Sequence, residues 1–402
     1  MNRVVYGVFV LLICPITFGQ DVSEEQLARL LKRFPAADTN KDGTLTKAEA
    51  LAYRNRLQGA ARQNRQRGVP TKFAVDPGWK KDRFPEHAVC YRSAEEILDL
   101  YTKRGRGRVT SYEKPSDGSL RIVGTGHSFM APGFQSFPRI AEAAGMNQPP
   151  LMTHTGGGIT GSARYKWEQE NGIFQFDKQP TPKLLAAISN GEWDAMMWGP
   201  YYNDQPEYYS CWIDFCLKYN PDMKFYLSDA WPQLGQLKSV PDSEQELTDE
   251  LFAKLEQEKR DASAILIAEL NKKYDNRVFV LPTSKAMVLA VKSWRAGRLP
   301  GIDGIHKVVG GKTNSLWRDK LGHLGPKLAP LEGYVFYATM YGTSPEKIEN
   351  PLRGIERELD NEFRRIAWQA VIQDPLSGVK DMNKNGLGDH LEAQVRTGAK
   401  EQ

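Results

Sequence analysis

A serine and a histidine stand side by side at the end of an apolar run. The stretch VGTGHSFMAPGF begins in the run LRIV, and its glycines allow a tight turn that presents His127 and Ser128 together. A serine hydroxyl next to a base is the starting point of nucleophilic acyl transfer. A serine after a turn is also a common helix N-cap. The stretch by itself therefore leaves both roles of Ser128 open.

Three later stretches carry the other groups that a nucleophilic serine needs. HTGGGITGS offers backbone N–H groups, WGPYYNDQ offers the amide of Asn203, and SLWRDKLGHLG offers Asp319 and His323. Backbone and amide donors stabilise an oxyanion, and a carboxylate orients the histidine that accepts the serine proton. Within the glycine stretch we choose Gly158 over Gly157 as the oxyanion donor.

Two acidic loops indicate a second kind of chemistry, which is calcium binding. In the first, DTNKDGTLTKAE, Gly43 at position 6 allows the sharp turn of an EF-hand loop, and helices are predicted on both sides. Hard oxygen ligands at positions 1, 3, 5, 7, 9 and 12 suit Ca²⁺. These positions hold Asp38, Asn40, Asp42, the Thr44 carbonyl, Thr46 and Glu49. A degenerate loop that binds no ion is the alternative.

The second acidic loop, DMNKNGLGDHLE, repeats the pattern near the end of the sequence. Pro375 and Gly378 interrupt its entering helix, so it resembles the calcium loops of bacterial exported proteins more than a full EF-hand. Its expected ligands are Asp381, Asn383, Asn385, the Leu387 carbonyl, Asp389 and Glu392. A plain surface turn is the alternative. We expect calcium to have a structural role rather than a sensing role in both loops.

The elements that must position the serine, the amide and the acid–histidine pair alternate between strands and helices. Short apolar runs predict strands at 120–126, 151–156, 193–200, 223–231 and 277–283. Helical patterns fall at 136–145, 181–190, 207–219, 244–274, 284–296, 331–341 and 352–373. This alternation predicts an α/β fold with a parallel sheet and helices on both faces. Ligand sites in such sheets lie at the carboxyl ends of the strands, where these polar groups would converge.

These stretches together resemble the SGNH (GDSL-like) hydrolase family, which has a flavodoxin-like α/β fold. GTGHSF, GGGITG, GPYYND and RDKLGHLG stand for the serine, glycine, asparagine and acid–histidine blocks, in the family's order, over 119–345. The absence of a G-x-S-x-G elbow argues against the ordinary α/β-hydrolases.

The resemblance implies a serine esterase that needs no cofactor for catalysis. His323 would take the Ser128 proton and Asp319 would orient the imidazole, while the N–H groups of Ser128 and Gly158 and the Asn203 amide would hold the oxyanion. The substrate would be an ester, with O-acetyl groups on a polysaccharide as the candidate. Four aromatic residues fit either sugar stacking or core packing: Trp198, Tyr201, Tyr202 and Trp231.

One departure from the family concerns the acid. The family has its aspartate three residues before the histidine, whereas Asp319 is four before His323, and Asp303 with His306 has the expected spacing. We prefer His323 because the apolar segment LEGYVFYATMYG follows it like the family's last helix, and because KVVGGK after His306 predicts a loop. The irregular spacing leaves a rival hypothesis, a calcium-binding exported adhesion or scaffold protein with an inactive SGNH-like domain.

The first residues predict export. Arg3 precedes an apolar segment, 4–13, that is too short to span a bilayer, and small residues follow it. We therefore predict a signal peptide over 1–20 and a secreted or periplasmic protein. No later segment is apolar enough for integral membrane contact, and the near-balanced net charge of +5 gives no general case for nucleic acid. The predicted organisation is completed by an EF-hand at 21–60, a basic linker at 61–117, the hydrolase domain at 118–375 and the second calcium loop at 376–402.

Overall fold

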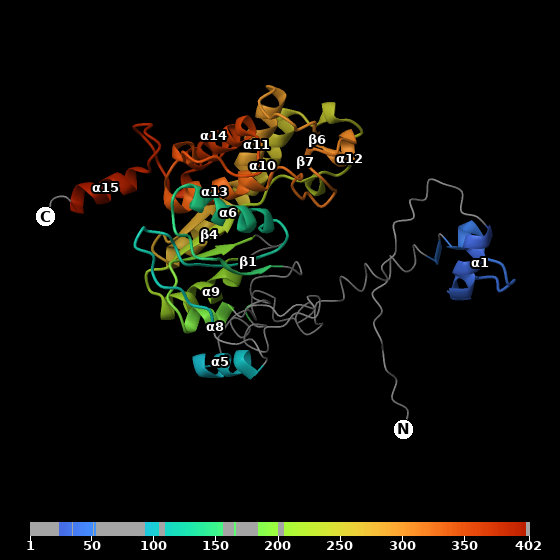
Figure 1. The fold of residues 1–402 in the computed structure, drawn as a ribbon, viewed down its shortest axis with the longest axis horizontal. Helices are drawn as coiled ribbons and strands as arrows, with labels where there is room; N and C mark the ends of the chain where they lie inside the picture. Colours follow the sequence, from blue (N-terminus) through green and yellow to red (C-terminus); the bar gives the residue numbers. More distant parts are fainter. Residues whose placement is uncertain are drawn as a thin grey trace. The chain divides into compact units, whose positions relative to one another are not determined.

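The chain divides into two compact units, Met1–Pro70 and Thr71–Gln402, which are described separately (Figure 1). The computed structural model describes residues 24–33, 35–50, 52–53, 93–103, 109–155, 165, 184–199 and 205–398. The predicted signal peptide, most of the predicted basic linker, and both Gly158 and Asn203 lie outside the described residues.

The first unit contains helix α1 (Glu24–Arg33), a short 3₁₀ turn η1 (Pro35–Ala37) and the first acidic loop. Residues 47–50, which include the last three positions of the loop, and residues 52–53 are helical. Helical turns therefore lie on both sides of the centre of the loop.

The second unit is built on a parallel sheet of five strands in the order β2-β1-β3-β4-β5. The predicted α/β class and the five predicted strands are confirmed. The strands are β1 (Ile122–Gly126), β2 (Met152–Thr155), β3 (Ala195–Trp198), β4 (Lys224–Ser228) and β5 (Val278–Leu281).

Helices cover both faces of this sheet because the strands bury side chains on both sides. Within β3, Met197 belongs to one hydrophobic core, and Met196 belongs to the other. Figure 1 shows α6, α13 and α14 on one side of the sheet and α8 and α9 on the other. The helices are α5 (Ala94–Lys103), α6 (Ala131–Ala143), α8 (Leu184–Ser189), α9 (Pro206–Tyr219), α10 (Asp249–Lys273), α11 (Thr283–Arg295), α13 (Ala329–Tyr341), α14 (Arg357–Gln373) and α15 (Asp389–Gly398).

A second, two-stranded parallel sheet follows α11 and was not predicted. It pairs β6 (Gly304–His306) with β7 (Ser315–Trp317), and the short helix α12 (Lys307–Gly310) connects them. The prediction of a loop for KVVGGK is therefore wrong for its first four residues, which form α12. Three-residue strands are too short to show a period in the sequence.

Two glycines let α6 and α13 pack closely against each other. A Cβ on Gly133 would lie 2.2 Å from the Phe336 ring, and a Cβ on Gly333 would lie 2.3 Å from the Ser136 Oγ. These helices follow the Ser128 and His323 segments, so their close packing brings the two segments to the same end of the sheet.

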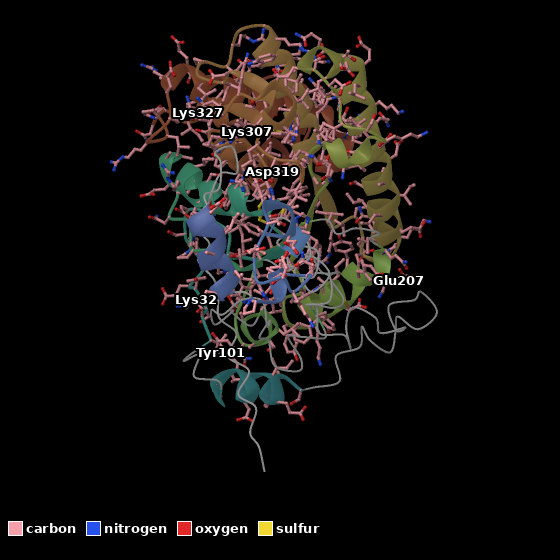
Figure 2. The ribbon with its side chains drawn as sticks, turned by 90° about the vertical axis from the view of Figure 1, so that its right-hand side faces the viewer. Lys32, Tyr101, Glu207, Lys307, Asp319 and Lys327 are labelled. Atoms are coloured by element: carbon pink, nitrogen blue, oxygen red, sulfur yellow. The ribbon has the colours of Figure 1, made fainter. Side chains whose placement is uncertain are left out.

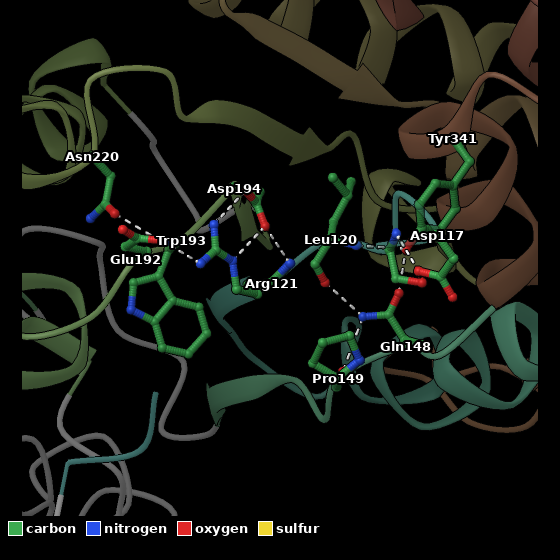
Figure 3. Close-up of polar contacts among 11 residues, drawn as sticks. Asp117, Leu120, Arg121, Gln148, Pro149, Glu192, Trp193, Asp194, Asn220 and Tyr341 are labelled. Atoms are coloured by element: carbon green, nitrogen blue, oxygen red, sulfur yellow. Dashed lines mark hydrogen bonds and ion pairs between the residues drawn. The ribbon is translucent and has the colours of Figure 1, made fainter. Parts of the chain in front are cut away.

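An ion-pair network holds the opposite, amino end of the sheet (Figure 3). The guanidinium of Arg121, just before β1, donates from Nε to Asp194 just before β3 (2.9 Å) and from Nη1 to Glu192 (2.8 Å). Arg121 is buried, and partners for a buried charge are needed to offset its desolvation. The network fixes two neighbouring strands at the end away from Ser128. Within the described part of the chain, no helix has the length and apolarity that crossing a membrane requires.

Candidate active site

Ser128 lies in the turn between β1 and α6, at the carboxyl end of β1, which is an interior strand of the sheet. The N-cap of α6 is Met130, without a side-chain cap bond, so Ser128 does not cap this helix. The turn has room only for a glycine at position 126. A Cβ on Gly126 would lie 2.7 Å from the Met130 side chain and 3.1 Å from the Gly199 nitrogen. Ser128 is exposed at this turn, so a ligand in solvent can reach its hydroxyl.

The structure brings His323 and Asp319 to Ser128. His323 Nε2 lies 2.6 Å from Ser128 Oγ, across 195 residues of sequence. His323 Nδ1 lies 2.8 Å and 3.0 Å from the two carboxylate oxygens of Asp319, which follows β7 and is labelled in Figure 2. An ionised carboxylate only accepts hydrogen bonds, so Nδ1 carries the hydrogen and the Nε2 lone pair faces the hydroxyl. This is the tautomer in which a histidine can take a serine proton.

The tight turn from Asp319 to His323 explains how a four-residue spacing still forms the pair. The Asp319 carboxylate accepts the amide of Leu321 at 3.0 Å and the amide of His323 at 3.2 Å. The Asp319 carbonyl accepts the Gly322 amide at 3.0 Å, and Gly322 has a φ of +89°, which favours glycine. The turn therefore directs both side chains of the pair toward each other.

The electrostatics keep Asp319 ionised. Partial burial raises the pKa of Asp319, but the hydrogen bonds from the His323 ring and amide and the attraction of the His323 charge lower it more, so the net pKa lies below its ordinary value. The Arg318 guanidinium also approaches the carboxylate at 3.5 Å. A stable anion next to Nδ1 can both orient the imidazole and stabilise the imidazolium that forms when the serine loses its proton.

One aromatic ring packs against the histidine, and a second packs behind the first. The Phe129 ring, one residue after Ser128, lies edge-on to the His323 ring with centroids 5.4 Å apart, and it lies 4.8 Å from the Trp231 ring. His127 accepts the Phe129 amide at Nδ1 (3.2 Å). No local pattern in the sequence predicts the contacts of Phe129 with Trp231 and His323, because they join residues that are far apart in the chain.

The alternative acid–histidine pair lies elsewhere in the fold. His306 is the last residue of β6, and its Nδ1 accepts the amide of Val308 (3.2 Å). Asp303 accepts a hydrogen bond from the Asn314 side chain (3.0 Å). Of the two histidines, His323 is the one in contact with Ser128.

Two of the four aromatic candidates for sugar stacking can be placed. Trp198 and Trp231 are each 1% exposed and belong to the two hydrophobic cores, so they do not offer a face to a carbohydrate. Tyr201, Tyr202, Gly158 and Asn203 lie outside the described residues.

The first acidic loop has the backbone turn that a calcium loop needs. Lys41 and Gly43, at positions 4 and 6, have φ values of +59° and +83°. Asp38 at position 1 accepts the Gly43 amide (2.9 Å), while Glu49 at position 12 accepts hydrogen bonds from Thr39 and Thr46. The carboxylate oxygens of Asp38 and Glu49 therefore accept hydrogen bonds from N–H and O–H groups of the loop itself.

The second acidic loop has the same turn. Lys384 and Gly386 have φ values of +59° and +78°, and Asp381 accepts the Gly386 amide (3.0 Å). Glu392 accepts from the Asn383 side chain at 3.0 Å. The loop is anchored to the end of α13 through backbone hydrogen bonds such as that from the Gly388 amide to the Gly342 carbonyl (2.7 Å).

The expected ligands of both loops fit a hard cation, since their side chains supply carboxylate and amide oxygens, with the Thr46 hydroxyl as well in the first loop. The carboxylates do not converge, however. Among the residues that the structure describes, no group of three or more His, Cys, Asp or Glu side chains is placed to hold a metal ion. Ion binding would require Glu49 and Glu392 to exchange their present donors for the cation.

Comparison with known proteins adds little. No family model matches the chain, and no curated protein matches it significantly. Among solved structures, the chain is similar to a DUF4886 family protein from Bacteroides uniformis, with 12% sequence identity and a TM-score of 0.46. The match covers 63% of this chain and 95% of that chain. Similarity of this size transfers neither a function nor a site residue.

Proposed function

We propose that this protein is an exported serine esterase of the SGNH type. The single observation that carries the proposal is the relay from Ser128 Oγ to His323 Nε2 (2.6 Å) and from His323 Nδ1 to the Asp319 carboxylate (2.8 Å). The strand order supports a flavodoxin-like arrangement, in which ligands bind at the carboxyl ends of the central strands beside the switch point. Ser128 follows β1, a strand at that switch point.

The chemistry follows from the three side chains. His323 Nε2 takes the Ser128 proton while Oγ forms a bond to the ester carbonyl carbon, and the carbonyl oxygen becomes an oxyanion. The imidazolium then gives its proton to the leaving alkoxide, which departs as the alcohol and leaves an acyl-serine. Water repeats the sequence in the second half, releasing the acid and restoring Ser128. Gly158, Asn203 and the Ser128 amide are the proposed oxyanion donors.

The proposed substrate class is an acyl ester of a bulky alcohol, with O-acetyl groups on a polysaccharide as the candidate. The exposure of Ser128 supports this class, because a hydroxyl at an open turn can be approached by a large carbohydrate. A deeply buried serine would restrict the alcohol to a small molecule.

The test is Ser128→Ala assayed on a chromogenic acetate ester and on acetylated polysaccharide, with acetate release as the readout. We expect turnover to fall to the background rate while the melting temperature stays close to that of the wild type. Ser189→Ala is the matched control, because Ser189 Oγ bonds helix carbonyls and the neighbouring Asn190 side chain at the end of α8, before β3. Residual turnover near the wild-type rate would overturn the nucleophile.

A serine-reactive phosphonate separates this proposal from the rival one. Labelling of the wild type and not of Ser128→Ala requires an activated serine. A wild-type protein that neither labels nor hydrolyses esters would instead support an exported adhesion or scaffold protein with an inactive domain.

We also propose that both acidic loops bind calcium in a structural role. The paired left-handed residues at positions 4 and 6 in each loop support this. Binding to the folded form alone adds about 2.7 kcal/mol of stability at a hundredfold excess over the dissociation constant. A chelator should therefore lower the melting temperature. Asp38→Ala and Asp381→Ala, compared separately, assign the effect to one loop. An unchanged melt would mean that neither loop binds the ion.

A further inference from the structure

Two residues that follow β4 contact the turn that carries Asp319 and His323. The Trp231 indole donates its Nε1 hydrogen to the carbonyl of Gly322, the residue just before His323. Gln233 lies against the same residue, since a Cβ on Gly322 would be 2.7 Å from the Gln233 Cβ. Both Gly322 and Trp231 are buried, so water does not compete for this carbonyl.

Trp231 also contacts the serine side of the site. Its ring lies 4.8 Å from the Phe129 ring, and Phe129 is bonded to Ser128 in the chain. Phe129 in turn lies edge-on to His323. One indole therefore reaches the serine segment through a ring contact and the histidine segment through a hydrogen bond.

The backbone before Trp231 is arranged to present this ring. Ala230 is buried and has a φ of +55°, a left-handed conformation that is uncommon for alanine. Ser228 Oγ accepts the Ala230 amide (3.1 Å), and the buried Asp229 carboxylate accepts the Ser284 amide at the start of α11 (2.9 Å). The turn is thus tied to two neighbouring elements while it directs Trp231 toward the site.

We propose that Trp231 is a positioning residue, which sets the distance between Ser128 Oγ and His323 Nε2 by holding the Gly322 carbonyl and the Phe129 ring together. It does not touch the reacting atoms. Proton transfer requires hydrogen-bond contact between the two groups, and a displacement of about 1 Å can cost about a hundredfold in rate. This inference rests on the proposed esterase function.

The test is Trp231→Phe, which keeps an aromatic ring beside Phe129 and removes the N–H donor. We expect kcat to fall about tenfold to a hundredfold with KM nearly unchanged, since substrate contacts stay in place. The rate constant for phosphonate labelling of Ser128 should fall by a similar factor, because it depends on the same serine–histidine contact.

The matched control is Trp193→Phe. Trp193 is also buried, 3% exposed, and its Nε1 also donates to a backbone carbonyl, that of Ala187 (2.8 Å), but it lies before β3 at the opposite end of the sheet. Both variants should lose similar stability, and only Trp231→Phe should lose kcat. Equal kcat in both folded variants, with Ser128→Ala inactive, would overturn the positioning role alone. Full activity of Ser128→Ala would overturn the esterase proposal itself.

Discussion

In the two aspartate–histidine pairs of this chain, the two residues are separated by similar distances in the sequence, but the pairs have different surroundings in the fold. Asp303 and His306 match the spacing of the SGNH family, but the His306 side chain is buried at 2% exposure, and its ring lies nearly parallel to that of Trp317 at 6.3 Å. Asp319 and His323 break that spacing by one residue, and His323 meets both the carboxylate and Ser128.

The difference shows what a proton relay demands beyond spacing. His323 has a partner on each ring nitrogen, whereas the buried Nε2 of His306 has no hydrogen-bond partner among the described residues. Burial lowers the pKa of His306 to about 4, and the nearby Asp319 carboxylate opposes this only in part. A buried neutral imidazole with no substrate access suits packing rather than catalysis. The comparison makes three predictions, ordered by expected effect.

The largest effect should come from the two histidines. His323→Ala should lower kcat/KM by about 10⁴-fold or more, and combining it with Ser128→Ala should add little, because the members of a triad act as a unit. His306→Asn should leave kcat/KM close to the wild-type value, since its amide oxygen can still accept the Val308 amide. Steady-state kinetics on an acetate ester measures both. The reverse outcome would assign the relay to Asp303 and His306.

A smaller effect should come from the two aspartates. Asp319→Asn keeps an oxygen for the turn amides of Leu321 and His323 but removes the anion beside Nδ1, so kcat should fall by about 10³–10⁴-fold. Asp303→Asn is the matched control, because exposed Asp303 accepts a side-chain hydrogen bond from Asn314. Equal kcat in the two variants would show that Asp319 contributes nothing to the relay.

The sequence predicted the features that depend on local patterns. Strand and helix periods identified all five strands of the main sheet, to within three residues at each end. The turn residues of both acidic loops were also expected, since Gly43 and Gly386 adopt the left-handed conformation that position 6 requires. Ser128, Asp319 and His323 were selected by their place after predicted elements.

The features that the sequence did not predict depend on contacts between distant segments. The hydrogen bond from Trp231 to Gly322 joins residues 91 apart, and neither residue carries a local signal of it. Likewise, the choice between His306 and His323 needed the position of β6, whose three residues show no period. The number of residues between aspartate and histidine therefore identified the pair beside Ser128 less well than the burial of each histidine did.

The smallest effect should appear in stability as a function of pH, and it concerns His306 alone. Its folded-state pKa of about 4 lies below the ordinary value of 6.5, so between these values the unfolded chain binds the proton and the folded protein does not. The free energy of unfolding therefore falls as the pH is lowered from about 6.5 to about 4, by at most about 3 kcal/mol from this group.

His306→Asn removes the titrating group and retains an acceptor for the Val308 amide, so its stability should vary less over this window. Denaturant unfolding of the wild type and of His306→Asn at several pH values between 4 and 7 measures the difference. Carboxylates titrate in both proteins, so the informative quantity is the difference in the free energy of unfolding between the wild type and His306→Asn at each pH. Parallel curves would mean that His306 protonates equally in the folded and unfolded states. Its ring would then be accessible to water, and the contrast with His323 would rest on the Ser128 contact alone.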